Sequence, residues 1–181
     1  MKIENVFPKS MNVVVDIDAA TRSTLWKISE LCNELWNIAL EQRRNKYSQG
    51  KSNAETQRLE LLGICKEHPR FNQPAFSVLE QVLYSLEEAY AQYHQALEDY
   101  KAKKRADTPA PPQPRDVNLF FPQRYQGDDI HFDQEHTMQL AYDQNWLSIE
   151  LPAGSYKSVK SVRVNFNASE DQFHLEMNPE E

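Results

Sequence analysis

Cationic side chains form two clusters in this 181-residue chain, and they are its best candidates for ligand chemistry. Each cluster follows a stretch whose apolar residues recur at helical spacing. The first cluster consists of Arg43, Arg44, Lys46, Tyr47 and Lys51, and the second of Lys101, Lys103, Lys104 and Arg105. Guanidinium and ammonium groups bind phosphate, and an aromatic ring beside them can stack on a base. The clusters predict nucleic-acid contacts or, alternatively, helix ends whose positive charge complements the helix dipole.

A run rich in histidine and carboxylates, residues 128–136, has spacing that could suit a metal ion. On a strand, His131, Asp133 and Glu135 would share one face, and His136 follows. The same pattern is typical of a solvated polar hairpin, which is the interpretation we adopt, so we predict no metal site and no cofactor. No nucleophile and base are spaced as a catalytic pair, and no glycine-rich phosphate loop occurs. We therefore expect no enzyme activity from this chain alone.

Apolar periodicity predicts three helices, over residues 21–48, 53–67 and 74–104. Thr21 or Ser23 can cap the first helix, and Gly50 follows its end. Pro74 suits the start of the third helix, because a first-turn N–H group has no intrahelical partner. The proline-rich residues 108–114 then predict an extended, semi-rigid linker.

Strand-like patterns occur before the helices and after the linker. We expect strands near residues 12–18, 118–121, 129–132, 138–142, 146–151, 159–166 and 172–177. Several short strands predict an antiparallel barrel or sandwich, which the first strand could join across the helices. The expected fold class is α+β: an antiparallel β-barrel with an inserted bundle of about three helices. Residues 1–18 would be the first strand of the β module, 19–107 a helical lobe, 108–115 the linker, and 116–181 the rest of the β module.

The net charge of −7 is unevenly distributed. Residues 106–181 carry 5 basic and 13 acidic side chains, whereas residues 19–105 carry 13 basic and 11 acidic ones. Because acidic surfaces repel the phosphate backbone, any nucleic-acid contact is expected on the helical part. No apolar run is long enough to span a membrane, no signal peptide is recognisable, and Cys32 and Cys65 fall in predicted helices. These features predict a cytoplasmic protein with reduced thiols.

Residues 31–47 have the sequence LCNELWNIALEQRRNKY. They resemble the first long helix of TnpB-like, transposon-encoded RNA-guided nucleases related to type V CRISPR effectors, in which a C-x-x-L-[WY]-N-x-A-L-E-[QR]-R-R-x-x-Y pattern recurs. The His68-Pro69 turn with residues 77–90, and residues 161–164 with 171–175, also look like segments of that family. The resemblance implies a helical recognition lobe inserted in a wedge-like barrel. Catalytic carboxylates and a zinc-ribbon segment would lie beyond Glu181.

In that family, this half of the protein grips guide RNA and the RNA–DNA heteroduplex and reads a short motif on duplex DNA. The resemblance implies that Ser77 and Gln81 lie where motif DNA is contacted, although Glu80, Glu87 and Glu88 accompany them. We expect a non-catalytic, nucleic-acid-associated protein that binds guide-like RNA, duplex DNA or both. The alternative is an acidic protein-interaction module that docks onto a basic nuclease or transposase partner.

Overall fold

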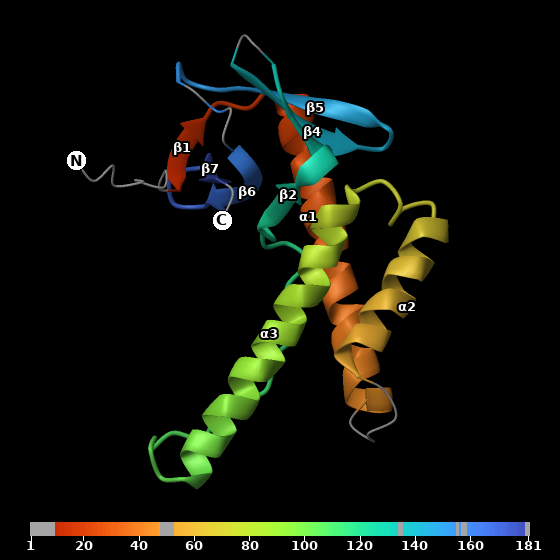
Figure 1. The fold of residues 1–181 in the computed structure, drawn as a ribbon, viewed down its shortest axis with the longest axis vertical. Coiled ribbons are helices and arrows are strands. Elements are labelled where there is room, and N and C mark those ends of the chain that lie inside the picture. Colours follow the sequence, from red (N-terminus) through yellow and green to blue (C-terminus); the bar gives the residue numbers. More distant parts are fainter. Residues whose placement is uncertain (1–9, 48–52, 134–135, 155, 157–158, 180–181) are drawn as a thin grey trace, which may run out of the picture.

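The computed structural model describes residues 10–47, 53–133, 136–154, 156 and 159–179. Its fold is α+β, as predicted, with three helices and two antiparallel sheets (Figure 1). The helices are α1 (Ala19–Gln42), α2 (Ala54–Glu67) and α3 (Phe76–Lys101). All three expected helices are therefore confirmed, with ends that differ from the predicted ones by a few residues.

Side chains near the start of α1 and of α2 satisfy N–H groups that the helix itself leaves unpaired. Asp18, rather than the expected Thr21 or Ser23, caps α1, because its Oδ1 accepts from the N–H groups of Ala20 and Thr21, each at 2.9 Å. Asn53 caps α2 by accepting from the Thr56 N–H at 2.8 Å. A π-helical turn at Arg43–Tyr47 continues α1 directly. The first basic cluster therefore begins where the backbone hydrogen bonds change from α-helical to π-helical spacing.

The larger sheet has the strand order β1-β7-β6-β2. It contains β1 (Met11–Val15), β2 (Gln123–Gln126), β6 (Val159–Asn167) and β7 (Gln172–Pro179). Strand β1 pairs antiparallel with β7, with Val13 opposite Leu175. The first strand therefore joins the C-terminal sheet across the helices, as the sequence suggested, and the three helices are an insertion between β1 and β2.

The smaller sheet has the order β3-β4-β5 and is a meander of β3 (Ile130–Phe132), β4 (Thr137–Tyr142) and β5 (Asn145–Glu150). The expected barrel is not formed, because neither sheet closes on itself in the described part of the chain. After β2 the chain turns at Gly127, where φ is +60°, and a 3₁₀ turn carries it into the second sheet. Glycine favours this left-handed conformation because it has no Cβ. The β strands thus separate into two open sheets.

The strand expected at residues 118–121 is wrong, and β2 lies just after it. Phe120 instead packs against α1 and the sheet, with its ring 5.2 Å from Trp26 and 5.4 Å from Phe173. Strand β2 was missed because its sequence, QRYQ, is polar, yet Gln123 and Tyr125 are completely buried. The Gln123 amide donates to the Leu25 carbonyl at 2.6 Å and so couples this strand to α1.

The three helices share one apolar core with the sheets, and the far half of α3 extends beyond it (Figure 1). Residues of α3 from Ser77 to Leu86 provide its buried positions, whereas later residues are at most half-buried. In the described residues, no helix has both the length and the apolar content needed to cross a bilayer.

Candidate nucleic-acid interface

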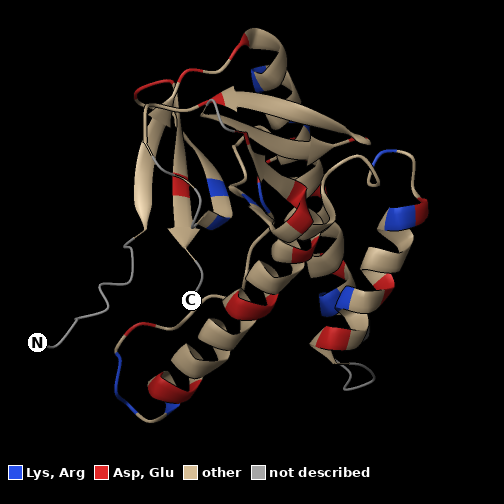
Figure 2. Ribbon diagram, turned by 45° about the horizontal axis from the view of Figure 1, so that its top comes forward, with Lys and Arg blue, Asp and Glu red and all other residues tan. Residues whose placement is uncertain are grey.

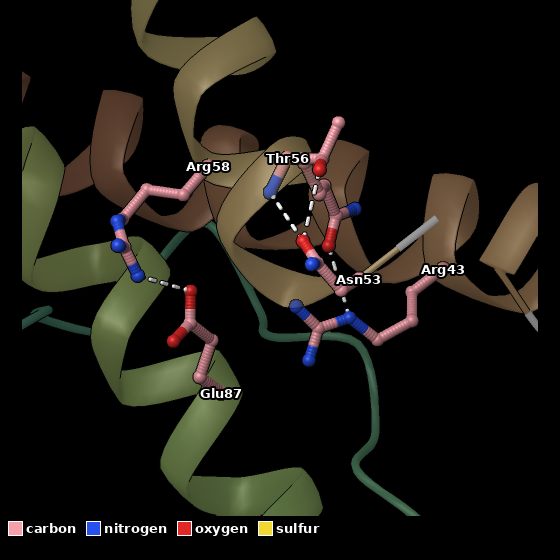
Figure 3. Close-up of polar contacts among 6 residues, drawn as sticks. Arg43, Asn53, Thr56, Arg58 and Glu87 are labelled. Carbon is pink, nitrogen blue, oxygen red and sulfur yellow. Dashed lines mark hydrogen bonds and ion pairs between the residues drawn. The ribbon is translucent and has the colours of Figure 1, made fainter. Parts of the chain in front are cut away.

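Arg43, the first member of the first basic cluster, is held between helices. Its Nε donates to Gln57 Oε1 at 2.9 Å (Figure 3). Its guanidinium lies 4.9 Å from the centroid of the Tyr90 ring. Gln57 is 1% exposed and donates in turn to the Ala39 carbonyl at 2.7 Å. Arg43 thus links α1, α2 and α3, so its cation stabilises the helical part as well as contributing charge.

The rest of the first cluster is only partly described. Arg44 is exposed, and its Nη2 donates to the Pro112 carbonyl at 2.8 Å. The side chains of Lys46 and Tyr47, and the whole of Lys51, lie outside the described residues. The described arginines of this cluster therefore both contact other parts of the protein.

The second cluster lies at the far end of α3 and in the turn after it. We call Lys101, Lys103, Lys104 and Arg105 the basic end. Its ion pairs are local: Lys101 Nζ lies 2.8 Å from Glu98 Oε1, Lys104 Nζ lies 4.0 Å from Asp99 Oδ1, and Arg105 contacts Asp107. The hydrogen bond between Arg105 and Asp107 raises the pKa of the guanidinium and lowers that of the carboxyl.

The geometry of the basic end leaves its charges accessible. The Lys101 and Lys104 side chains are 61% and 72% exposed, and Lys103, at φ +57°, turns the chain out of the helix. Exposed ion pairs contribute little to stability because solvent screens them, so a phosphate can replace their carboxylates at small cost. Figure 2 shows carboxylates along α3 and cations at its far end.

The two basic clusters do not form one surface. The end of α1 and the far end of α3 lie apart in both ribbon views (Figures 1 and 2). A single short ligand would therefore contact one cluster, and among the residues whose side chains the structure describes, those of the basic end are the more exposed.

The segment that follows the proline-rich stretch is bound to α1. We call residues 112–121 the strap. The Trp36 indole donates to the Gln113 carbonyl at 3.0 Å, and the Asn37 side chain both donates to the Arg115 carbonyl and accepts from its N–H, at 2.9 and 2.8 Å. The Arg115 guanidinium also covers the Trp36 ring at 4.6 Å. These contacts order the chain between the helices and β2.

Farther along the strap, two polar residues of α1 continue these contacts. Asn33, 1% exposed, donates to the Leu119 carbonyl at 2.7 Å, and the Phe121 N–H donates to Ser29 Oγ at 2.6 Å. Sequence analysis missed this role, although polar residues inside the apolar stripe of α1 were a visible signal: a buried amide needs a partner.

The start of α3 is occupied by the protein itself. Ser77 is 7% exposed, and its N–H donates to Asp129 Oδ2 at 3.1 Å, so a carboxylate from the β module satisfies the helix start. Gln81 is half-buried. Because Ser77 is buried, contact between DNA and its side chain would require the surrounding structure to open, whereas Gln81 remains partly accessible.

The polar run at residues 128–136 is used within the fold. His131 packs against Trp146, with centroids 4.5 Å apart, and Asp133 accepts from the Thr137 N–H at 2.8 Å. Glu135 lies outside the described residues. Within the residues that the structure places, no three metal-binding side chains converge on a point.

Burial disfavours the thiolate of both cysteines, which are free thiols in the structure. It raises the pKa of Cys32 far above its usual range and that of Cys65 to about 11. Both thiols are therefore protonated at neutral pH and behave as small apolar groups.

Comparison with known proteins does not indicate a function for this chain. No protein family model matches the chain, and no curated protein is significantly similar to it. A function is therefore inferred from three features of the structure: the basic end, the inserted helical part and the acidic C-terminal module.

Proposed function

We propose that this chain is a non-catalytic, nucleic-acid-associated protein that resembles the N-terminal half of a TnpB-like RNA-guided nuclease. The observation that carries the proposal is the pairing of β1 with β7, which makes the helices an insertion in a sheet. An inserted helical lobe is the arrangement that the resemblance of residues 31–47 implies. Guide-like RNA or duplex DNA is the proposed ligand.

The basic end provides the contact surface in this proposal. Its cations are exposed and its ion pairs are weak, so phosphates can compete with the neighbouring carboxylates. Each phosphate contact releases condensed counterions, which makes such binding favourable at low salt. The acidic C-terminal module limits the affinity, because it repels the rest of the nucleic acid.

A mobility-shift experiment with a charge-matched control tests the proposal. Lys103→Glu/Lys104→Glu reverses two charges of the basic end, and Lys27→Glu/Lys66→Glu reverses two exposed lysines elsewhere, so the net charge is the same. We expect wild-type protein to retard RNA or duplex DNA at micromolar concentration in low salt, the basic-end variant to bind at least about tenfold more weakly, and the control to bind more tightly than that variant. Absence of retardation by wild-type protein, or equal loss in both variants, would contradict the proposal.

A second candidate function is an acidic protein-interaction module that docks onto a basic nuclease or transposase. It is favoured by the internal contacts of Arg43 and Arg44 and by the excess of carboxylates in residues 106–181. The experiment is co-purification with proteins encoded beside this chain. A stable, salt-sensitive complex together with no retardation of nucleic acid would favour this candidate over the first.

A further inference from the structure

A small pocket lies where the helical part meets the β module. It has a volume of about 250 Å³ and is formed by the loop before α3, residues 72–75, and by the β4–β5 hairpin, residues 141–146. Three contacts hold its two walls together: the Asp143 N–H donates to the Gln73 carbonyl at 2.8 Å, the Tyr142 hydroxyl donates to Gln73 Oε1 at 3.2 Å, and Pro74 forms a β-bridge with Tyr142. The pocket is therefore pre-formed rather than assembled by a ligand.

The lining combines carboxamides with one large ring. Asn72, Gln73, Gln144 and Asn145 carry carboxamides, of which Gln73 Oε1 already accepts from the Tyr142 hydroxyl and Asn145 Nδ2 already donates to the Asp143 carbonyl. Trp146, which is 42% exposed, is the largest aromatic residue of the lining. His131 packs on Trp146, with centroids 4.5 Å apart, which fixes the indole. An open polar pocket with an aromatic residue at its wall suits a planar ligand whose edge carries hydrogen-bonding groups.

The charge of the lining residues restricts the class of ligand that the pocket can bind. None of the lining residues is Lys or Arg, and the only charged one is Asp143. A phosphate would therefore be repelled, whereas a neutral heterocycle would not. The pocket is smaller than the roughly 300–1,000 Å³ typical of sites for drug-sized ligands, so it suits a single ring system.

The hairpin that carries these groups is locally strained. Asp143 and Gln144 have φ values of +47° and +60°, a two-residue turn that usually contains Asn-Gly or Gly. Non-glycine residues in this conformation are uncommon, and they persist where neighbouring contacts hold them, here the hydrogen bond from Asp143 to Gln73. This hydrogen bond holds the turn, and with it Gln144 and Asn145, beside the loop before α3.

We propose that this pocket binds one unpaired nucleobase, stacked on Trp146 and hydrogen-bonded along its edge by the carboxamides. Asparagine and glutamine amides pair with base edges in two-point fashion, and unstacked bases commonly lie on aromatic side chains. The base would belong to the nucleic acid of the proposed function, on which this inference rests. The pocket and the basic end lie at opposite ends of α3, about 39 Å apart along a 26-residue helix.

Fluorescence of 2-aminopurine, a base analogue that is quenched when it stacks, tests the pocket directly. The probes are free 2-aminopurine riboside, 20-nucleotide single strands of RNA and DNA with one central 2-aminopurine, and a duplex in which that base is paired. We expect quenching with the riboside and the single strands but not with the duplex. Trp146→Ala should weaken binding of the riboside about tenfold or more, and Trp146→Phe should retain most of it.

Two further variants test whether the quenching depends on the pocket lining or is a general effect of substitution. Asn72→Ala and Gln144→Ala remove exposed carboxamides of the lining and should weaken quenching without loss of folded protein, whereas Leu59→Ala, on an exposed position of α2, should change nothing. Quenching that is equal in wild type and Trp146→Ala, or that is absent with the riboside, would overturn the pocket proposal.

The experiments distinguish failure of the pocket proposal from failure of the proposed function. If wild-type protein retards nucleic acid without Trp146-dependent quenching, the pocket proposal fails and the proposed function stands. If the riboside is quenched through Trp146 but no polynucleotide is bound, the pocket proposal stands as a nucleobase site and the proposed function fails.

Discussion

Single buried polar residues do much of the positioning in this protein. Asn33, Gln57 and Gln123 are each at most 1% exposed, and each donates to a backbone carbonyl of another segment. In the sequence, Asn33 interrupts an apolar stripe and Gln123 belongs to a polar segment, so neither resembles a core residue. The structure shows that they join segments that are far apart in the chain, because a buried amide must find a partner.

Asn33→Ala should therefore destabilise the protein by about 1–3 kcal/mol, because the Leu119 carbonyl loses its 2.7 Å hydrogen bond and keeps only the 3.4 Å one from the Ser29 hydroxyl. Urea unfolding at neutral pH measures the change. Asn45→Ala, at an exposed position after α1, is the matched control and should stay within about 0.5 kcal/mol of wild type. Equal effects of the two substitutions would contradict the role assigned to Asn33.

Asp18 gives a prediction about pH. Hydrogen bonds from the Thr21 hydroxyl, the Thr21 N–H and the Ala20 N–H lower the pKa of its carboxyl in the folded state. A lowered folded-state pKa contributes stability that is present above the unfolded-state pKa and is lost as the pH falls through the folded-state value. Asp18→Asn retains an acceptor but does not titrate.

The stability difference between wild type and Asp18→Asn should thus be largest near neutral pH and should shrink below about pH 4, where the unfolded carboxyl is protonated. Thermal unfolding of both proteins between acidic and neutral pH measures this difference. A difference that is independent of pH would show that the charge of Asp18 has no role in capping α1.

At the scale of the elements, the strap makes contacts with α1 that its composition did not predict. Proline-rich composition predicted an extended linker, and the segment is indeed without helix or strand, but it is tied to α1 by Trp36, Asn37 and Arg44. Extended proline-rich backbone leaves its carbonyls unpaired, so it suits a row of side-chain donors on a helix.

Asn37→Ala should loosen the strap, because it removes two hydrogen bonds to the Arg115 backbone. An arginine-specific protease should then cleave after Arg115 about fivefold faster relative to Arg105, since cleavage requires local opening and the lost bonds contribute about 1 kcal/mol. Mass spectrometry of the fragments measures the ratio, with Asn45→Ala as control. An unchanged ratio would mean that Asn37 does not hold the strap.

For the whole molecule, nucleic-acid binding should depend on the combination of a net charge of −7 with the exposed basic end. Few phosphates can be neutralised, so the logarithm of the binding constant should fall only gently with the logarithm of salt concentration. Lys103→Glu/Lys104→Glu should reduce the magnitude of that slope by about 1 for each lost phosphate contact. Titration of wild type and variant at several salt concentrations measures both slopes, and identical slopes would place the contact elsewhere.

The sequence by itself determined the elements whose signal is local. The three helices follow from apolar residues every three or four positions, and β1 and β3–β7 from strand-like composition, so the α+β class was predictable. The position of the basic residues at helix ends was visible in the same way.

Tertiary structure decided which of these features face solvent. Arg43 lies between helices, Ser77 is buried and its N–H donates to Asp129, and polar β2 is a buried strand because its partners come from distant segments. The contact between Asn33 and Leu119 spans 86 residues of sequence. Local periodicity reports the average environment of a residue, whereas the burial of a cation or an amide depends on whether the folded chain brings a specific partner to it.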